Sequence, residues 1–528
     1  MAETLPVLVV GAGPTGLTAA MELSRMGIPV RIVDKLKEFS TTSRALAVQA
    51  RTLELFAQRG LTPEMLRIGN AAHGTSIYAD GKLLGRIDLT LVPSPFNMIL
   101  LLAQSETERL LREQLGRQGV TVERETELIA IAQNGETADH GTPVRAVLRK
   151  TDGSLEEVDA AYLIATEGAH SSIRHTLGLD FKGKSLPHTY ALADIHIDGD
   201  LPQDELTVFL GAKGLLASFP MGGGRFRVIA SLQDAPQSPA AQSQQTDAQH
   251  GEGEGYAPHA EPTVEEIQHL WDAGSSIAGR MHDMVWSSSF RINSRMVDKL
   301  RVGRIFLGGD AAHVHSPAGG QGMNTGIQDM INLTWKLAMV YKGVAKPELL
   351  DTYEQERLPL IKGIVSKTEG ATDLLDSESR WTHLLVTHIA PIALGSDTVK
   401  HTSAGILSQV KGNYEKSPLS ARHASMGGVH SGDRLPPELF ATEDASKSIL
   451  ESLTPDRFTL LRWNGNDEQP TFSAKFESLP VRLKPEAHDS FGRADSILVR
   501  PDGYIAWLGK RADENELATW WNTWFISA

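Results

Sequence analysis

Apolar residues follow two different patterns along this chain. Over residues 1–75, 100–180 and 290–370, short apolar runs alternate with stretches of helical periodicity, as where residues 5–10 lead into residues 17–25. Such alternation is typical of a parallel sheet covered by helices. Between these regions the β-prone runs are short and broken by glycines, which predicts an antiparallel sheet. These runs are residues 189–198, 205–211, 214–219 and 225–232.

The composition changes at two further places. Residues 233–262 are rich in Gln, Ser, Ala, Pro and Gly, with almost no large apolar side chains, so we expect a mobile surface loop. Thr263 and Glu266 then have the spacing of a capping box at the start of a helix. After helices expected over about 350–395, the turn signal Pro501-Asp-Gly503 predicts a hairpin, with strands at residues 457–463, 496–500 and 504–508.

The first motif with chemical meaning is Gly11-Ala-Gly-Pro-Thr-Gly16, between a predicted strand and a predicted helix. In a dinucleotide-binding turn, Gly11 permits the turn, Gly13 lets the backbone approach a pyrophosphate, and Gly16 allows close packing of helix and strand. The N–H groups at the start of the helix can bind the anion. Asp34 closes the next predicted strand and can accept hydrogen bonds from a ribose diol. This motif alone leaves NAD and FAD open.

A second glycine-rich segment, almost three hundred residues later, decides between the two cofactors. Arg304-Ile-Phe-Leu-Gly-Gly-Asp310 has the pattern of a buried strand that ends in a carboxylate, and a long helix is expected over residues 325–341. A second strand-to-helix junction suits a cofactor with a long ribityl chain and a ring. Asp310 can accept hydrogen bonds from ribityl hydroxyls, and the backbone N–H groups of residues 320–324 can face the pyrimidine edge of an isoalloxazine. Together the two motifs predict FAD.

Length and charge narrow the class of protein further. A chain of 528 residues is long enough for two or three domains. Its formal net charge of -14 argues against nucleic acid or an anionic membrane as a partner, because both require a basic surface. No apolar stretch reaches about 18 residues and the first residues lack a basic signal segment, so we expect a cytoplasmic protein without a membrane span.

The chain contains no cysteine, which excludes disulfides, thiolate metal sites and thiol chemistry. His313 and His315 have the spacing of a metal-binding pair, but they lie inside the second glycine-rich segment and Asp310 is the sole nearby carboxylate, so we expect no metal site. The chain also lacks a Gly-x-Ser-x-Gly elbow. The sequence therefore does not contain the motif expected of a hydrolase with such an elbow.

The two glycine-rich motifs resemble those of the class A FAD-dependent aromatic hydroxylases, the para-hydroxybenzoate hydroxylase-like flavoprotein monooxygenases. The resemblance covers most of the chain and includes Ser43-Arg44-Ala45 with Arg51-Thr-Leu-Glu54, then Leu101-Leu-Ala-Gln-Ser105, and finally Tyr162 to Arg174. It implies an α/β fold in which a Rossmann-like FAD-binding domain is interleaved with an α+β substrate domain beneath the flavin ring. As in the phenol and polyketide hydroxylase branch, a thioredoxin-like C-terminal domain follows.

The resemblance also implies domain limits and cofactor contacts. The FAD-binding domain is expected at residues 1–75, 100–180 and 290–370, the substrate domain at 76–99 and 181–289, a helical linker at 371–400 and the C-terminal domain at 401–528. In the family, the positions that match Arg44 and Gln104 contact FAD, and the segment that matches residues 317–324 lies along the flavin ring. The expected FAD-binding residues are Gly11, Gly13, Pro14, Thr15, Gly16, Asp34, Lys35, Arg44, Gln104, Asp310, Pro317, Gly320, Gly322, Met323 and Asn324.

One position departs from the family pattern. A short family motif linked to both FAD and NAD(P)H normally begins with aspartate and glycine, whereas this chain has Glu167-Gly168. The carboxylate is kept and is one methylene longer, so we expect the fold to survive.

The resemblance implies an NAD(P)H- and O2-dependent monooxygenase that hydroxylates an aromatic, phenolic or polyketide-type substrate through a flavin C4a-hydroperoxide. Either NADPH or NADH would serve as co-substrate. Three alternatives stay open: an FAD-dependent oxidoreductase without oxygen insertion, a Baeyer-Villiger or epoxidising monooxygenase on the same scaffold, and a non-enzymatic flavin-binding protein. An aspartate of phenol-hydroxylase-like relatives aligns with Leu46, so that base is absent. Tyr78, Arg225, His282 and Asp283 are possible replacements, but each fits a surface or packing role better, so the catalytic residue is not identified.

Without thiols, the C-terminal region can have no redox role and should contribute stability, assembly or pocket closure. Trp520, Trp521 and Trp524 are expected to pack the final helix, and this aromatic-rich region could form a homodimer surface. We expect residues 1–395 to be sufficient for FAD binding.

Overall fold

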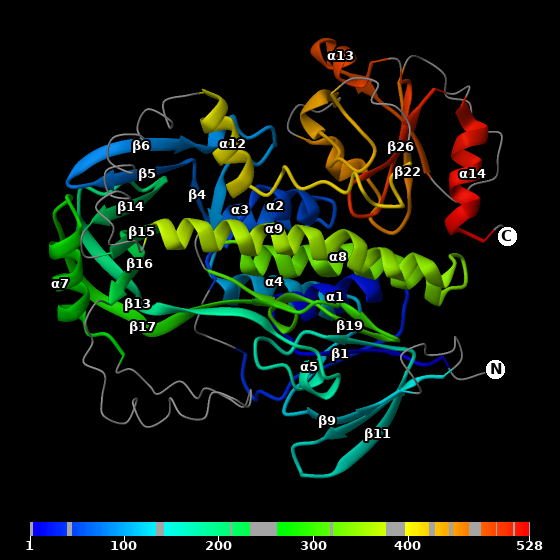
Figure 1. Ribbon diagram of the computed structural model, residues 1–528, viewed down its shortest axis with the longest axis horizontal. Coiled ribbons are helices and arrows are strands. Elements are labelled where there is room, and N and C mark those ends of the chain that lie inside the picture. Colours follow the sequence, from blue (N-terminus) through cyan, green and yellow to red (C-terminus); the bar gives the residue numbers. More distant parts are fainter. Residues whose placement is uncertain are drawn as a thin grey trace.

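The computed structural model describes residues 4–39, 45–133, 142–211, 214–232, 261–316, 320–375, 397–421, 428–442, 447–463, 477–492, 494–510 and 513–526. Figure 1 shows three groups of elements: a sheet with an outer helix at the left, a helix-covered sheet in the centre, and a smaller sheet with a terminal helix at the upper right. The long helices α8 and α9 run side by side across the middle and connect the three groups.

The central group is built on a six-stranded sheet in the order β18-β19-β12-β1-β2-β8. Pairs β1–β2, β1–β12, β12–β19 and β2–β8 are parallel, as the alternation of strands and helices predicts. The strands are β1 (Val7–Val10), β2 (Val30–Val33), β8 (Val122–Glu123), β12 (Tyr162–Ala165), β18 (Arg301–Val302) and β19 (Ile305–Leu307). The packed helices are α1 (Pro14–Arg25), α4 (Gln104–Arg117), α8 (Gly322–Tyr341) and α9 (Asp351–Leu375). These elements share one core in which β1 and β12 are almost fully buried.

The second group is an eight-stranded sheet in the order β20-β17-β13-β16-β15-β14-β5-β6. Its strands are β5 (Gly74–Ala79), β6 (Lys82–Asp88), β13 (Lys182–Gly199), β14 (Glu205–Gly211), β15 (Gly214–Gly222), β16 (Arg225–Leu232), β17 (Gly279–Met296) and β20 (His313–Val314). The pairs are antiparallel except β14 with β5, which confirms an antiparallel sheet over the glycine-broken runs. One face is covered by α7 (Val264–Gly274), whose Ile267 and Trp271 are fully buried.

Helix α7 begins at the predicted capping box. The Thr263 side chain accepts a hydrogen bond from the Glu266 N–H, and the Glu266 carboxylate accepts one from the Thr263 N–H at 2.8 Å. The loop expected before it, at residues 233–262, lies outside the described residues except for residues 261 and 262. Two short sheets complete this half of the chain, β11 (Leu155–Ala160), β10 (Val144–Arg149) and β9 (Glu127–Ala132) in one, and β3 (Ala47–Val48), β7 (Ile99–Leu101) and β4 (Asn70–Ala72) in the other. Short helices α2 (Ala50–Ala57), α3 (Thr62–Ile68) and α5 (Ser172–Thr176) join them, and α12 (Asp397–Leu407) follows α9.

The C-terminal group has a four-stranded sheet in the order β23-β22-β25-β26 and the final helix α14 (Glu514–Trp524). Its strands are β22 (Thr459–Arg462), β23 (Glu477–Pro480), β25 (Ser496–Val499) and β26 (Ile505–Gly509); β21 (Phe440–Ala441) pairs with β24 (Arg482–Leu483), and α13 is His488–Phe491. Pro501-Asp-Gly503 forms the turn between β25 and β26, as predicted. Trp520 and Trp521 pack edge-on against Phe458, with ring centroids 6.0 and 5.3 Å away.

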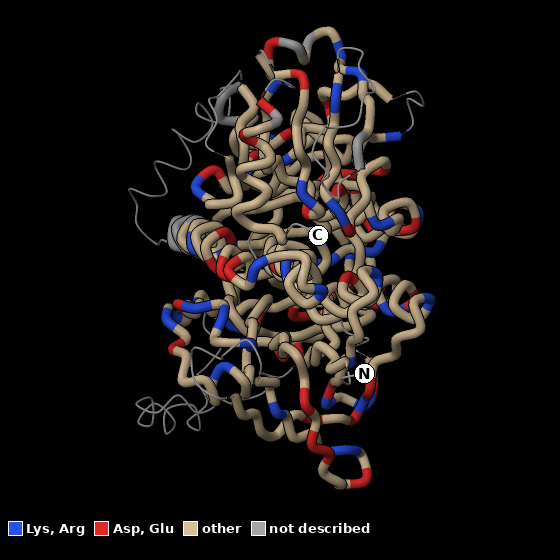
Figure 2. Tube along the Cα trace, turned by 90° about the vertical axis from the view of Figure 1, so that its right-hand side faces the viewer, with Lys and Arg blue, Asp and Glu red and all other residues tan. Residues whose placement is uncertain are grey.

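Charges of both signs are interspersed over the molecule. Figure 2 shows Lys and Arg among Asp and Glu along the trace. In the part of the chain described above, no helix is long and apolar enough to cross a membrane.

Candidate active site

The first glycine-rich segment forms a turn that leaves no room for side chains on its inner side. Gly11 has a φ of +100°, and a Cβ atom there would lie 2.3 Å from the Thr166 carbonyl oxygen. A Cβ atom at Gly16 would lie 1.9 Å from the Gly11 carbonyl oxygen. The Thr166 hydroxyl donates to the carbonyls of Val10 (2.8 Å) and Gly11 (3.0 Å) and holds β1 against β12. Only glycine fits Gly11 and Gly16 without moving the backbone.

The start of α1 has the properties of an anion site. Helix α1 begins at Pro14 after Gly13, with no side-chain cap and no acidic residue in its first turn, so the positive end of its dipole is not compensated by a side chain of that turn. A Cβ atom at Gly13 would meet no atom within 4 Å. Asp34 accepts hydrogen bonds from the N–H groups of Ala12 (2.7 Å) and Leu36 (2.8 Å), so it holds the turn as well as lying beside it. Lys35 is exposed.

The two glycine-rich segments are locked together through Thr15. A Cβ atom at Gly309 would lie 2.5 Å from Thr15 Oγ1, and one at Gly326 would lie 2.4 Å from the same atom. Thr15 belongs to the first turn of α1, whereas Gly309 precedes Asp310 and Gly326 lies in the second turn of α8. Asp310 is exposed, and the contact of its neighbour Gly309 with Thr15 places it near the start of α1. Motifs that are far apart in sequence thus form one site.

The start of α8 is fixed by Asn324, which is fully buried. Its side-chain amide donates to the carbonyls of Ala47 and Gly320, both at 2.8 Å, and its carbonyl accepts from the Gln49 N–H at 2.9 Å. The side chain is therefore used inside the protein, and only the backbone of Asn324 can face a cofactor. Gly322 and Met323 occupy the first turn of α8, where N–H groups lack intrahelical partners.

Three further predicted FAD contacts are Gln104, Arg44 and Pro317. Gln104 begins α4, accepts from the Ala45 N–H at 3.2 Å and donates to Glu108 at 2.9 Å. Arg44 and Pro317 lie outside the described residues.

Sequence reasoning missed two links between this site and the segment that follows β12. The Arg174 guanidinium, which is 3% exposed, donates to the Ala311 carbonyl at 3.1 Å, directly after Asp310. Glu167 accepts from Ser171 (2.5 Å), Ser172 (2.7 Å) and the Ile173 N–H, and so caps α5. Glu167 is the position that departs from the family pattern. Its carboxylate thus holds the segment after β12 in place, and helix α5, which it caps, carries Arg174.

His313 and His315 lie next to Asp310 and have parallel rings 6.4 Å apart. His313 Nε2 lies 2.7 Å from Asp329, and His315 Nδ1 donates to the Ser316 carbonyl at 2.9 Å. Burial lowers the pKa of His315 to about 4, so its ring is neutral near pH 7. Among the described residues, the other ring nitrogens, His313 Nδ1 and His315 Nε2, are buried without a hydrogen-bond partner. A large polar cofactor such as FAD fits these features. It would offer hydrogen-bond partners to the buried ring nitrogens and to the uncapped start of α1, and the space at Gly13 would let it approach the backbone.

The face of the eight-stranded sheet opposite α7 adjoins this site. Leu46 packs in one cluster with Phe219, and Ala47 beside it contacts Gly320. Arg227 is the cross-strand neighbour of Phe219, and it forms a buried ion pair with Asp194 at 2.7 and 2.9 Å.

Further along the same face the lining is aromatic. Tyr190 stacks on Phe290 with ring centroids 5.8 Å apart, and Ile229 and Leu215 pack beside them. Trp286 lies opposite Asp194, with the Arg227 guanidinium 5.7 Å from its ring centroid. The Phe219 end of this face therefore lies beside Ala47, which contacts Gly320, and the Asp194–Arg227 pair and the Tyr190–Phe290 stack follow it along the strands.

Of the four residues considered as substrate bases, Arg225 lies two residues before Arg227 on β16 and so shares its face, whereas Tyr78, His282 and Asp283 lie elsewhere in the sheet. Tyr78 stacks on Phe209 at 5.3 Å in the cluster under α7. His282 is bonded to Asp283 at 2.9 Å, and Asp283 is exposed. Arg225 begins β16. Tyr78 and the His282–Asp283 pair thus have the packing and surface roles expected for them.

A dinucleotide-binding turn, a second glycine-rich loop locked against it and an adjoining antiparallel sheet define a flavin-dependent oxidoreductase. Residues 4–368 match the FAD binding domain family, and residues 429–528 match the family "Aromatic-ring hydroxylase, C-terminal". The chain belongs to the FAD-dependent aromatic-ring monooxygenases.

Relatives and solved structures agree with this family. The chain is 32% identical to 6-methylpretetramide 4-monooxygenase of Streptomyces rimosus, over 97% of this chain and 92% of that protein. The structure of OxyS anhydrotetracycline hydroxylase from Streptomyces rimosus superposes with a TM-score of 0.77 at 28% identity and covers 99% of both chains. CabE, an aromatic hydroxylase from angucycline biosynthesis, also gives a TM-score of 0.77, at 29% identity, over 98% of this chain and 99% of CabE.

Proposed function

We propose that this protein uses NADPH or NADH and O2 to hydroxylate an electron-rich polycyclic aromatic compound of the polyketide type. The observation that carries this proposal is a sheet face with aromatic side chains whose Phe219 end packs with Leu46 and Ala47, beside Gly320 of the second glycine-rich segment. The substrates named for the similar hydroxylases, 6-methylpretetramide and anhydrotetracycline, support the same substrate class.

Within this proposal, the described residues would hold FAD from several sides. The first turn of α1, with Gly13, Pro14 and Thr15, would bind the pyrophosphate, and Asp34 would accept from the ribose. Asp310 would accept from the ribityl chain, and the backbone N–H groups of Gly320 to Asn324 would face the ring. Arg44, Lys35, Gln104 and Pro317 remain predicted FAD contacts from the sequence. When bound, FAD supplies the redox and oxygen chemistry that no side chain of this chain can perform.

The protein's own part is to orient the substrate and exclude water. Tyr190, Phe290 and Phe219 would contact a planar aromatic substrate over the sheet. The Asp194–Arg227 pair is a buried polar group on this face and would bind a phenol or its conjugate base. This arrangement would take the place of the acid that is replaced by Leu46.

The nicotinamide cofactor would bind only transiently. The chain has one dinucleotide fingerprint, at Gly11 to Gly16, which is assigned to FAD. NAD(P)H would therefore reduce the flavin from a groove and leave, with weak, saturable kinetics. Isolation of the protein with stoichiometric NADP would contradict this part of the proposal.

The decisive experiment measures NADPH oxidation by the FAD-loaded protein over a panel of single-ring phenols and polycyclic aromatic polyketides. We expect stimulation by polycyclic phenols, with one atom of isotopically labelled dioxygen found in the product by mass spectrometry. Stimulated oxidation that gives only hydrogen peroxide, or turnover under anaerobic conditions with another electron acceptor, would favour an oxidoreductase without oxygen insertion. Arg227→Met should abolish product formation, whereas Arg280→Met, which changes an exposed arginine at the far end of β17, is the control for a loss of surface charge.

A further inference from the structure

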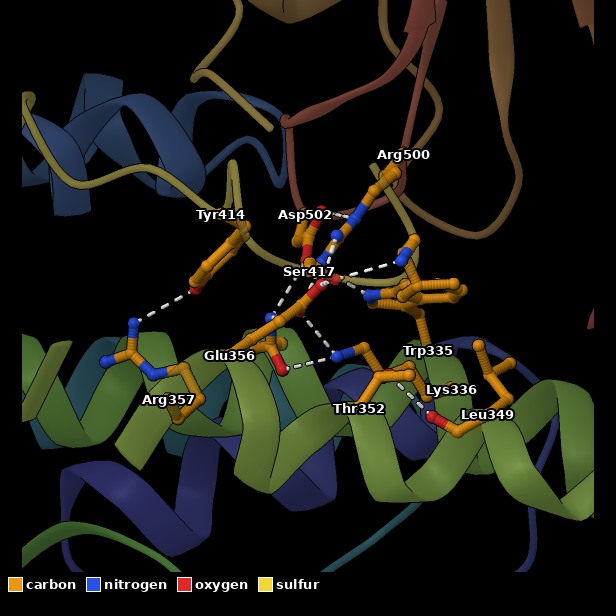
Figure 3. A network of polar contacts seen from close by, with 12 residues as sticks. Trp335, Lys336, Leu349, Thr352, Glu356, Arg357, Tyr414, Ser417, Arg500 and Asp502 are labelled. Atoms are coloured by element: carbon orange, nitrogen blue, oxygen red, sulfur yellow. Dashed lines mark hydrogen bonds and ion pairs between the residues drawn. The ribbon is translucent and has the colours of Figure 1, made fainter. Parts of the chain in front are cut away.

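A buried arginine on α9 connects three segments that surround the second glycine-rich loop. The Arg357 guanidinium is 1% exposed. Its Nε donates to Asp329 Oδ1 at 2.7 Å, and its two terminal nitrogens donate to the Thr325 carbonyl at 3.2 Å and the Tyr414 hydroxyl at 3.1 Å. The Tyr414 contact is drawn in Figure 3. Arg357 thus holds the first turns of α8 against α9.

The other oxygen of Asp329 holds the loop itself. Asp329 Oδ2 accepts from the Gly309 N–H at 3.1 Å and lies 2.7 Å from His313 Nε2. Gly309 directly precedes Asp310, and His313 follows it by three residues. One fully buried carboxylate therefore fixes the loop on both sides of Asp310.

The carboxylate of Asp329 stays ionised inside the protein. Burial by itself would raise its pKa, but Arg357 and His313 lower it below its usual value. A buried carboxylate is stable only while such partners remain, so loss of Arg357 would leave a charge that the loop must move to accommodate.

The neighbouring residue of α9 provides an internal comparison. Glu356 is equally buried but accepts from Lys336 (2.7 Å), Arg500 (2.6 and 2.8 Å) and Ser417 (2.6 Å), as Figure 3 shows. None of these partners belongs to the loop that carries Asp310. Consecutive residues of one helix thus hold two ion-pair networks, one connected to the loop and one to the C-terminal sheet.

We propose that Arg357 and Asp329 are positioning residues for the FAD site, which hold the loop on either side of Asp310 in its FAD-binding conformation. This inference rests on the proposed function only in that Asp310 faces FAD. If the inference is right, variants of Arg357 or Asp329 should weaken FAD binding more than a control variant that loses the same unfolding free energy at another buried ion pair.

The test compares Arg357→Met and Asp329→Asn with the control Lys336→Met, which removes an equally buried cation from the other network. Apoprotein stability is measured by urea unfolding, and the FAD Kd by titration followed through the visible flavin spectrum. We expect the FAD Kd to rise by about ten- to hundredfold in the first two variants, the loss of roughly one charge-assisted hydrogen bond. The control should lose stability yet keep its FAD Kd within about twofold and its flavin band shape unchanged.

Equal changes of the FAD Kd in Arg357→Met and Lys336→Met would overturn the inference. If Arg357→Met does not fold, Arg357→Lys keeps the charge beside Asp329 but cannot reach all three partners; it should bind FAD with intermediate affinity. Wild-type FAD affinity in that variant would also overturn it. Hydroxylation is measured on the same preparations: its absence from wild-type protein that binds FAD would contradict the proposed function alone.

Discussion

Replacing Gly326 by alanine should separate the two glycine-rich segments that form the candidate FAD site. The new Cβ atom would lie 2.4 Å from Thr15 Oγ1 and 3.0 Å from the Gly309 Cα. Rotation of Thr15 would not remove the strain, because its β-branched side chain is stiff at χ1 and the 3.0 Å contact with the Gly309 Cα would remain. Either α1 or α8 must therefore move.

The expected cost follows from two opposing effects. Inserting a methyl group into a packed contact costs about 1 to 3 kcal/mol. Alanine in place of glycine in a helix interior returns about 1 kcal/mol through helix propensity. Gly363, in α9, is a matched control, because a Cβ atom there would meet nothing within 4 Å. Gly363→Ala should stabilise the protein by up to about 1 kcal/mol, so the two variants should differ by about 1 to 3 kcal/mol.

Urea unfolding of the apoprotein and FAD titration together check this prediction. Gly326→Ala should lower the unfolding midpoint relative to Gly363→Ala and should also raise the FAD Kd, because the displaced segments carry Asp310 and the start of α1. Adding Thr15→Ala should restore part of the stability, since it removes the hydroxyl that clashes. If Gly326→Ala is as stable as Gly363→Ala and binds FAD like the wild type, the contact through Thr15 does not position the site.

Three further predictions concern individual charged groups. Asp310→Ala should weaken FAD binding by about 1.5 to 3 kcal/mol, whereas Asp310→Asn should keep more of it, as measured by FAD titration. The pKa of His315 is lowered from 6.5 to about 4, so the fold favours its neutral form. This contribution of about 3 kcal/mol to stability is fully present above pH 6.5 and is lost as the pH falls towards 4; the difference in unfolding free energy between wild type and His315→Gln, measured with urea, should change by that amount over this range. Arg59 and Arg25 outweigh burial and lower the pKa of Glu22 from 4.5 to about 2. Its contribution of about 3 kcal/mol should be present above pH 4.5 and lost as the pH falls to about 2, so that wild type and Glu22→Gln converge in acid; parallel profiles would contradict the assignment.

Features with a local cause could be predicted from the sequence. The strand before Gly11, the capping box at Thr263 and the turn at Pro501 each depend on neighbouring residues, and the structure has all three. The pairing of the two glycine-rich segments was also predictable, because each has a recognisable strand-to-helix junction. What remained hidden was the physical contact between them, through Thr15 and Gly326.

The buried polar residues of α8 could not be predicted in the same way. Asp329, Asn332 and Lys336 are at most 1% exposed, although such residues in a helix normally mark its solvent-facing side. Their partners Arg357 and Glu356 come from α9, and Glu356 pairs in turn with Arg500, so no local pattern reveals the pairs. Buried charges of this kind depend on tertiary structure alone.

The same ion pairs change the view of the C-terminal region. Arg500 and Asp502 lie at the turn between β25 and β26, yet their side chains reach Glu356 on α9 and Trp335 on α8, as Figure 3 shows. A chain that ended near residue 395 would keep Glu356 and Lys336 but lose Arg500, which lowers the pKa of Glu356 most strongly. Because breaking a buried pair costs about 3 to 5 kcal/mol, residues 1–395 would fold only if water or a rearranged α9 compensated that charge. The C-terminal sheet therefore contributes to the stability of the helix pair α8 and α9, through the contacts of Asp502 with Trp335 and of Arg500 with Glu356.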